Sequence, residues 1–236
     1  MSDWPLIPKP AELAEQRLIG AILGGVFPVN STLPPERELA TMLGVTRPTL
    51  REALQRLSRD GWLEIRQGKP TRVTNYFHEG SLGILNTLAH HPENMPANFV
   101  PDLLRFRIVL APSYAHEAIQ NHPQQVCDLL ETLQSLVDDA ETFAEADVRL
   151  HKALTTLSGN CIYPLVYNGF AQLSLIMGNA YFSDITARDR SRDFYADLWA
   201  AAQLPDPNQA ELVTREVMME SLNYWIKITN QRSDHV

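Results

Sequence analysis

The chain has 236 residues, 44% of them hydrophobic and 20% charged, which is the composition of a globular protein with a buried core and excludes extensive disorder. Its two cysteines, Cys127 and Cys161, are too few for a disulfide framework, and both follow apolar helical patterns. No stretch approaches the ~18 uninterrupted apolar residues of a membrane-spanning helix, and the N-terminus lacks the pattern of a secretory signal. We therefore expect a soluble, cytoplasmic protein that contacts no membrane, with both cysteines reduced and buried.

The charge is distributed unevenly along the chain. Residues 1–78 carry a net charge of +2 and residues 79–236 a net charge of −10, within a total of −8. A mildly basic first part on an acidic body suits a protein that meets nucleic acid through one face only.

Two short helices and their stop signals follow an N-terminal arm. Residues 1–10 are rich in proline and are expected to be loosely held. Residues 11–23 have the apolar spacing of an amphipathic helix, which Gly24 and Gly25 end. A second helix is predicted over 36–43, and Gly44 ends it because glycine accepts the left-handed backbone of a helix C-terminus.

The next helix has a buried side and a basic side. Thr46 is a suitable N-cap, and Pro48 falls within the first turn, where a helix tolerates proline. The apolar positions repeat at helical spacing: Leu50, Ala53, Leu54 and Leu57. The first turn presents Thr46, Arg47, Thr49 and Arg51 on other faces. The free N–H groups of such a turn attract anions, and arginine donates two hydrogen bonds to guanine, so this pattern indicates a DNA recognition helix.

A β-hairpin is predicted directly after this helix. Residues 62–66 and 71–74 read as strands, and the basic turn Gln67-Gly68-Lys69-Pro70 joins them. Two arginines on a helix are by themselves more often a solvated surface. The hairpin in register, together with eight Lys or Arg against five Asp or Glu over 32–75, favours a winged helix-turn-helix that binds DNA.

The remainder of the chain reads as helices separated by Pro, Gly or Asn. The predicted helices cover 82–90, 100–120, 123–139, 142–157, 162–181, 186–203 and 207–230. The predicted fold class is therefore mainly α: a winged helix-turn-helix domain with a small β-hairpin over 1–75, a short linker over 76–81, and an all-α antiparallel bundle effector domain over 82–236.

No catalytic motif is present in the helical part. It contains no G-x-S-x-G and no Gly-rich phosphate loop, and the cluster of Asp138, Asp139 and Glu141 reads as a solvated helix end. We therefore expect no enzyme activity. The later helices are rich in Met, Tyr and Trp, a composition that fits either plain bundle core or the lining of a small-molecule pocket.

The first part of the chain resembles a known family. PPERELA followed by GVTRPTLREALQRLSRDGWLEIRQGKPTRV resembles the DNA-binding domain of the GntR family of bacterial regulators. RDGWL, QGKPT and patches of the later sequence resemble the FadR/FCD-type subfamily. The resemblance implies a homodimer on a near-palindromic operator, released from DNA by long-chain fatty acyl-CoA. It also implies repression of fatty-acid degradation genes and activation of unsaturated fatty-acid synthesis genes.

The resemblance assigns residues that contact DNA. They are Arg37, Thr46, Arg47, Thr49 and Arg51 on the helices, and Gln67, Gly68 and Lys69 at the hairpin turn. Two positions depart from the family pattern: Pro48 replaces a threonine, and Gln67 replaces a histidine. Proline removes a hydroxyl and an N–H donor, so a phosphate contact at Pro48 is expected to be lost, whereas glutamine still forms hydrogen bonds in a groove.

The resemblance also assigns an acyl-CoA site, and the six residues predicted for it are Arg107, Tyr181, Tyr195, Met218, Ser221 and Trp225. Here the chain departs from the pattern at three positions: Met218 replaces a glycine, Asn230 a lysine and Ser174 a tyrosine. Methionine fills space beside the ligand, and loss of the lysine removes a cation for the CoA phosphates. We expect a site with changed affinity or chain preference; a chain that no longer binds acyl-CoA is the alternative.

Metal and other ligands are the remaining alternatives. Many FCD-type domains bind a metal through a histidine in the position of His151 and two later histidines, but the later positions here read Tyr195 and Ser221. One histidine cannot hold a metal, so we predict neither a metal nor a cofactor. A GntR regulator that senses a small organic acid is the alternative function, and a helical metabolic enzyme is a distant third.

Overall fold

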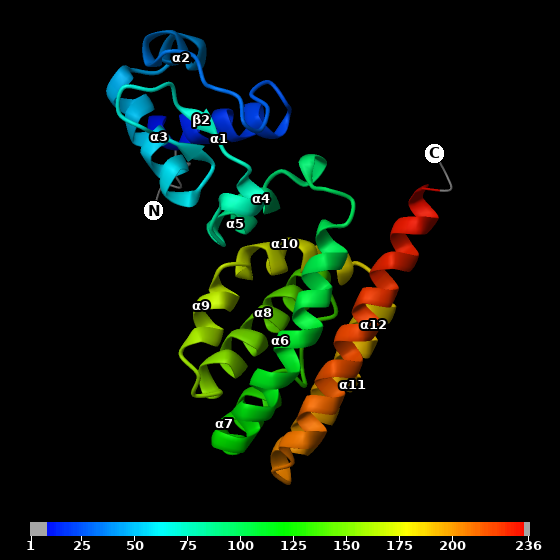
Figure 1. Cartoon of the computed structure of the whole chain (residues 1–236). Helices are drawn as coiled ribbons and strands as arrows, with labels where there is room; N and C mark the ends of the chain where they lie inside the picture. The colour runs from blue at the N-terminus through cyan, green and yellow to red at the C-terminus, as the bar shows by residue number, and fades with distance from the viewer. Residues whose placement is uncertain (1–8, 234–236) are drawn as a thin grey trace, which may run out of the picture. The chain divides into compact units, whose positions relative to one another are not determined.

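The computed structural model describes residues 9–233, and the side chains of 228–233 lie outside that description. The predicted N-terminal arm therefore falls almost entirely outside the described residues. Contacts divide the chain into two compact units, one up to Asn94 and one from Met95 onward, and each is described by itself (Figure 1).

The first unit is a winged helix-turn-helix, as predicted. Its elements are α1 (Pro10–Leu23), α2 (Glu36–Leu43), α3 (Arg47–Asp60), β1 (Leu63–Glu64) and β2 (Arg72–Val73). The two strands pair antiparallel, with Leu63 opposite Val73 and Glu64 opposite Arg72. They are shorter than predicted, because the segment between them opens into the exposed turn of the hairpin.

Local signals in the sequence account for the helix ends. Gly44 ends α2 with a left-handed backbone at φ 66°, and the Thr46 side chain caps α3. Gly61 ends α3 at φ 90°, where a Cβ would lie 2.6 Å from the Cα of Gly80. Glycine is therefore required at position 61 both for its backbone angle and for the close approach of the following chain.

The segment after the hairpin packs on the first unit. It forms α4 (Tyr76–Glu79), α5 (Gly83–Ala89) and the 3-10 turn η1 (Pro92–Asn94). The Ser81 N–H donates to the carbonyl of Asp60 at 3.0 Å, and the Tyr76 ring lies 4.6 Å from that of Trp62. The expected linker over 76–81 is thus a helical turn, and the helix expected at 82–90 groups with the winged unit. By contacts the division falls at Asn94 and not at the expected linker, because these close packings were invisible in the sequence.

The second unit is all-helical within its described part, as predicted. Its helices are α6 (Phe99–Asn121), α7 (Pro123–Glu131), α8 (Ala140–Leu157), α9 (Ile162–Asn168), α10 (Ala171–Tyr181), α11 (Ile185–Gln203) and α12 (Pro207–Ser233). α12 packs along α6 and α11, and α10 packs on α8. The single helix predicted over 162–181 is two helices that break at Gly169 and Phe170, and the helix predicted over 123–139 ends at Glu131.

Two further sequence predictions are decided by the structure. Cys127 is buried, and burial raises the pKa of its thiol, but Cys161 is exposed, so the prediction was wrong for that residue. Cys161 lies at the N-cap of α9, where the chain turns at the surface. No helix among the described residues is long and apolar enough to cross a membrane.

Candidate functional sites

The first turn of α3 is the centre of the predicted DNA surface. The Thr46 hydroxyl accepts a hydrogen bond from the Thr49 N–H at 3.4 Å and lies 2.8 Å from the Thr49 hydroxyl. Both threonines are therefore engaged in starting the helix. Arg47 and Pro48 occupy the next two positions, and both are exposed to solvent. Proline is tolerated there because the N–H groups of the first turn have no partner within the helix.

A carboxylate at the start of α2 contacts two of the arginines that are predicted to bind DNA. Glu36 Oε2 lies 2.8 Å from Arg51 Nε and 3.8 Å from Arg47 NH2. The arginine side chains remain 60% and 58% exposed. Exposed ion pairs of this kind are weak, so a phosphate or a base edge can replace Glu36. Arg37, also predicted to contact DNA, is exposed on the same helix as Glu36.

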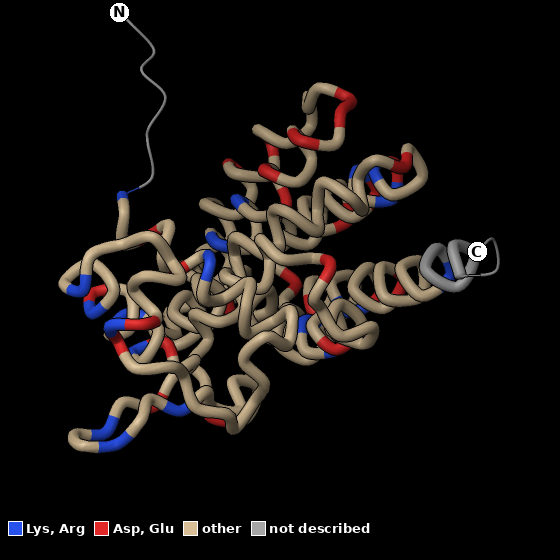
Figure 2. The backbone as a smooth tube through the Cα atoms, turned by 90° about the horizontal axis from the view of Figure 1, so that it is seen from above, with Lys and Arg blue, Asp and Glu red and all other residues tan. Residues whose placement is uncertain are grey.

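The hairpin turn completes this surface. Gln67, Gly68 and Lys69 are exposed, and Gly68 adopts φ 73° so that the Lys69 N–H can donate to the Arg66 carbonyl at 3.1 Å. Arg51 and these three turn residues line one open groove between the hairpin and α2. The structure thus brings the recognition helix and the hairpin together as predicted. Lys and Arg positions are blue and Asp and Glu positions are red along the backbone in Figure 2.

The second unit contains a cavity of about 60 Å³ between α6, α8, α10, α11 and α12. Of the residues predicted for the ligand site, five line it: Arg107, Tyr181, Met218, Ser221 and Trp225. Ser174 lines it as well. Tyr195 does not; it is 4% exposed and its hydroxyl has no hydrogen-bond partner. The side chain of Asn230 lies outside the described residues.

Tyr181 and Ser221 form the polar contact at one side of the cavity. Their hydroxyl oxygens lie 3.2 Å apart, and the Ser221 hydroxyl also donates to the Val217 carbonyl at 2.8 Å. Burial raises the pKa of Tyr181, and the hydrogen bond to Ser221 partly offsets this, so the phenol stays protonated. Met218 is 4% exposed and occupies space beside the pair, as its replacement of a glycine led us to expect.

A series of buried polar groups in mutual contact extends from the cavity into the core. Arg107 NH2 lies 3.2 Å from Asp147 Oδ2, and Asp147 Oδ1 lies 3.3 Å from His151 Nε2. The other ring nitrogen of His151 lies 2.7 Å from the hydroxyl of Tyr114. Arg107 and Asp147 both line the cavity, so its polar wall is supported by fully buried partners.

Burial and neighbouring charges shift the pKa values of these buried polar groups. Burial on its own would raise the pKa of the Asp147 carboxyl, but His151 and Arg107 outweigh it and hold that pKa well below its usual range. Burial lowers the pKa of His151, and the neighbouring Asp147 offsets this only in part. Burial raises the pKa of Tyr114. His151 Nδ1 lies within hydrogen-bond distance of the Tyr114 hydroxyl, whereas Nε2 lies 3.3 Å from Asp147 without an aligned hydrogen bond.

His151 lies at the position where the sequence comparison with FCD-type domains suggested a metal ligand. Its Nδ1 lies 2.7 Å from the Tyr114 hydroxyl and its Nε2 lies 3.3 Å from Asp147, so protein groups lie against both ring nitrogens. Within residues 9–233 no three His, Cys, Asp or Glu side chains are grouped as metal ligands. The absence of a metal remains a prediction.

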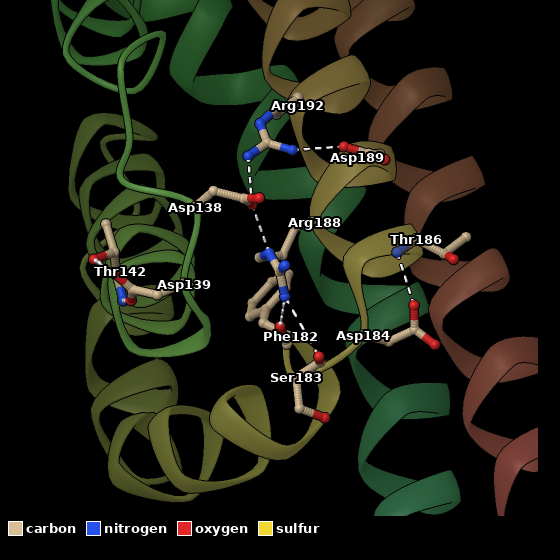
Figure 3. A network of polar contacts seen from close by, with 10 residues as sticks. All are labelled: Asp138, Asp139, Thr142, Phe182, Ser183, Asp184, Thr186, Arg188, Asp189 and Arg192. Atoms are coloured by element: carbon tan, nitrogen blue, oxygen red, sulfur yellow. Dashed lines mark hydrogen bonds and ion pairs between the residues drawn. The ribbon is translucent and has the colours of Figure 1, made fainter.

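The turn between α10 and α11 is held by a polar network that the sequence analysis missed. The Arg188 guanidinium donates to the Phe182 carbonyl at 2.7 Å and to Asp138 at 2.7 Å, and Arg192 also contacts Asp138 at 2.7 Å (Figure 3). Hydrogen bonds from both arginines lower the pKa of Asp138. Because Phe182 lines the cavity, this network fixes one of its walls. The i, i+4 spacing of the two arginines was the available signal.

The acidic cluster is therefore not simply a solvated helix end. Asp138 joins the segment before α8 to α11, and Asp139 caps α8 by accepting from the Thr142 N–H at 2.7 Å. Only Glu141 is free of a structural role of this kind among the contacts described.

The size of the cavity limits what it can hold as it stands. A cavity of about 60 Å³ is far smaller than the roughly 300–1,000 Å³ of sites that hold drug-sized ligands. A long acyl chain requires far more room. Any such ligand must therefore displace Met218 or move the helices that enclose the cavity.

Models of known protein families match both the first and the second part of the chain. Residues 10–73 match the model of bacterial regulatory proteins of the gntR family, and residues 74–236 match the model of the FadR C-terminal domain. A fatty acid metabolism regulator protein of Shewanella oneidensis is 40% identical over 220 residues, which are 93% of this chain and 91% of that protein. A protein of the same description from Shewanella denitrificans is 41% identical, with 93% and 92% covered.

A solved structure shares the fold at lower identity. It is described as Lar, which controls the expression of the agr system of Listeria monocytogenes, and it matches with a TM-score of 0.65 and 14% identity over 92% of this chain and 96% of that one. The matched boundary at residues 73 and 74 lies close to the end of the predicted DNA-binding domain. Residues 74–94 match the second model in sequence but group with the first unit by contacts.

Proposed function

The chain belongs to the FadR family of GntR-type regulators, and on that basis we propose that long-chain acyl-CoA, bound in the helical unit, releases it from operator DNA. It is a DNA-binding transcriptional regulator of fatty-acid metabolism and not an enzyme. The observation that carries the proposal is the cavity, because five of the six residues assigned to the acyl-CoA site line it.

We propose that α3 enters the major groove and that Arg47 and Arg51 leave Glu36 to contact bases and phosphates. The exposed, weak ion pairs to Glu36 support this exchange. Lys69 and Gln67 at the hairpin turn would contact the adjacent groove. Two copies of the chain would bind the halves of a near-palindrome, as symmetric recognition of a two-fold site requires. A protein of this kind works where the chromosome is, in the cytoplasm.

The ligand part of the proposal rests on the make-up of the cavity. Apolar side chains such as Leu103, Leu104 and Phe194 form most of its wall, and the Tyr181–Ser221 pair offers hydroxyls to a thioester carbonyl. Expansion of the cavity would displace α10 and its turn. Ligand and DNA then oppose each other, and by linkage each weakens the binding of the other by the same factor.

A small organic acid is the second candidate, and one observation favours it. Arg107 is a buried cation in the cavity wall, which suits a carboxylate. Asp147 already neutralises that cation, however, so a carboxylate would have to compete with a buried partner. The acyl-CoA proposal needs no such exchange.

The test is fluorescence anisotropy of a labelled FadR-type operator at fixed salt, titrated separately with oleoyl-CoA, free CoA and oleate. We expect release by oleoyl-CoA alone, with gene repression and activation following operator occupancy. Tight DNA binding that no acyl-CoA disturbs would overturn the proposed ligand and direct the search to small organic acids.

A further inference from the structure

Ser174 is a buried hydroxyl without a hydrogen-bond partner in the wall of the cavity. It lies on α10 and is 6% exposed. Its backbone N–H donates to the Phe170 carbonyl at 2.8 Å, as expected in a helix, but its hydroxyl oxygen has no partner among the described residues. A serine in a helix usually donates to a carbonyl of the preceding turn, so this hydroxyl is unusual. Buried groups of this kind in native proteins call for an explanation.

Arg107 provides a second unused donor in the same wall. Its NH2 group contacts Asp147 at 3.2 Å, but its Nε, although buried, has no hydrogen-bond partner. Most of the remaining cavity lining is apolar, and the Asp147 carboxylate in that lining bonds to neither of these two groups. The Ser174 hydroxyl and Arg107 Nε therefore each lack an acceptor.

Ser174 lies away from the Tyr181–Ser221 pair that would meet the thioester. Ser174 precedes Tyr181 by seven residues on α10, so it is about 10 Å further along the helix. An acyl chain whose carbonyl lies beside Tyr181 and Ser221 would therefore bring later carbons, and not its carbonyl, next to Ser174.

We propose that the cavity selects acyl chains that carry an oxygen, as a hydroxyl or oxo group, well beyond the thioester carbonyl. The inference rests on the proposed acyl-CoA function and names the class of chain that the site prefers. An unsubstituted chain leaves the Ser174 hydroxyl and Arg107 Nε without partners, whereas an oxygen on the chain supplies the acceptor. Sites built to form a hydrogen bond discriminate strongly against analogues that lack the group.

The experiment is isothermal titration of the full-length chain with hexadecanoyl-CoA and with hexadecanoyl-CoAs hydroxylated near the thioester, at mid-chain or at the chain end. We expect a mid-chain or terminal hydroxyl to tighten binding by about tenfold, the effect of one recovered hydrogen bond. In S174A the difference in affinity between hydroxylated and unsubstituted hexadecanoyl-CoA should disappear. S183A, which removes an exposed hydroxyl just after the same helix, is the matched control and should keep the preference.

Each other outcome counts against a defined part of the account. If the unsubstituted chain binds and no distal hydroxyl improves it, or if S174A retains the gain, the inference is wrong and the acyl-CoA function stands. A gain only from a hydroxyl next to the thioester contradicts the placement of Ser174. Failure of every acyl-CoA to bind refutes the proposed function together with the inference.

Discussion

The two units each use an arginine–carboxylate pair, in opposite environments. In the winged unit Arg51 meets Glu36 with side chains that are 60% and 37% exposed. In the helical unit Arg107 meets Asp147 with side chains that are 12% and 16% exposed. An exposed pair contributes little and exchanges readily, whereas a buried pair cannot lose one member without leaving an uncompensated charge. The first arrangement suits a surface that exchanges partners with DNA; the second suits a permanent contact between α6 and α8.

The largest expected effect is on stability, from breaking the buried pair. D147A removes the partner of both Arg107 and His151, so we expect it to lower the free energy of unfolding by about 3–5 kcal/mol. E36A, the matched change in the exposed pair, should cost no more than about 1 kcal/mol. Urea unfolding followed by circular dichroism measures both. Equal costs for the two variants would show that burial does not distinguish the pairs.

Acid should remove the difference in stability between the wild type and D147A. Because the folded-state pKa of Asp147 is depressed, its contribution to stability is present above the unfolded carboxyl pKa of about 4 and is lost as the pH falls through the folded value. His151 acts in the same direction: its folded pKa is also depressed, so stability falls as the pH drops below its ordinary value of about 6.5. Unfolding titrations of wild type and D147A should converge in acid; a gap that stays constant with pH contradicts this assignment.

The next effect concerns DNA reading by the exposed arginines. R47A should weaken operator binding by about 1–3 kcal/mol, since a bidentate arginine–guanine contact discriminates by that amount. Binding to random DNA should fall much less. R59A, which removes an exposed arginine near the end of the same helix, is the control and should leave specificity unchanged. Equal losses on operator and random DNA would argue that Arg47 contacts phosphates only.

The smallest expected effect is on operator affinity, from changing Glu36, the carboxylate that would compete with DNA for Arg47 and Arg51. E36Q keeps the shape of the side chain but frees Arg47 and Arg51, so operator binding should become a few-fold tighter, in line with about 1 kcal/mol or less for an exposed pair. E38Q, on the same helix and also exposed, serves as the control. Fluorescence anisotropy at several salt concentrations compares the operator affinities of E36Q and E38Q. Weaker operator binding by E36Q would instead mean that Glu36 positions the arginines for DNA.

The winged unit could be predicted from the sequence because its determinants are local. Gly44, Thr46 and Gly61 set the helix ends within a few residues of the helices that they end, and the hairpin follows α3 directly. The grouping of residues 76–94 with the winged unit by contacts could not be predicted, because close approaches such as that of Gly80 to Gly61 join segments that are distant in the sequence. Local signals therefore predicted the elements, whereas the grouping of residues 76–94 by contacts depends on packing.

The cavity was harder to predict, because its residues come together from distant helices. Arg107 and Asp147 are 40 residues apart, and only the i, i+4 spacing of Asp147 and His151 indicated a shared face. Tyr195 was expected in the cavity and is absent from its lining, since the rotation of α11 in the bundle is set by packing. The unpartnered hydroxyl of Ser174 follows from three-dimensional surroundings that no spacing encodes.

The central claim is that DNA and acyl-CoA oppose each other through one protein. The most direct measurement is the affinity of oleoyl-CoA for the free protein and for the protein saturated with operator, beside the affinity of operator with and without oleoyl-CoA. The account predicts that both affinities weaken by the same factor. An oleoyl-CoA affinity that operator DNA leaves unchanged would contradict it.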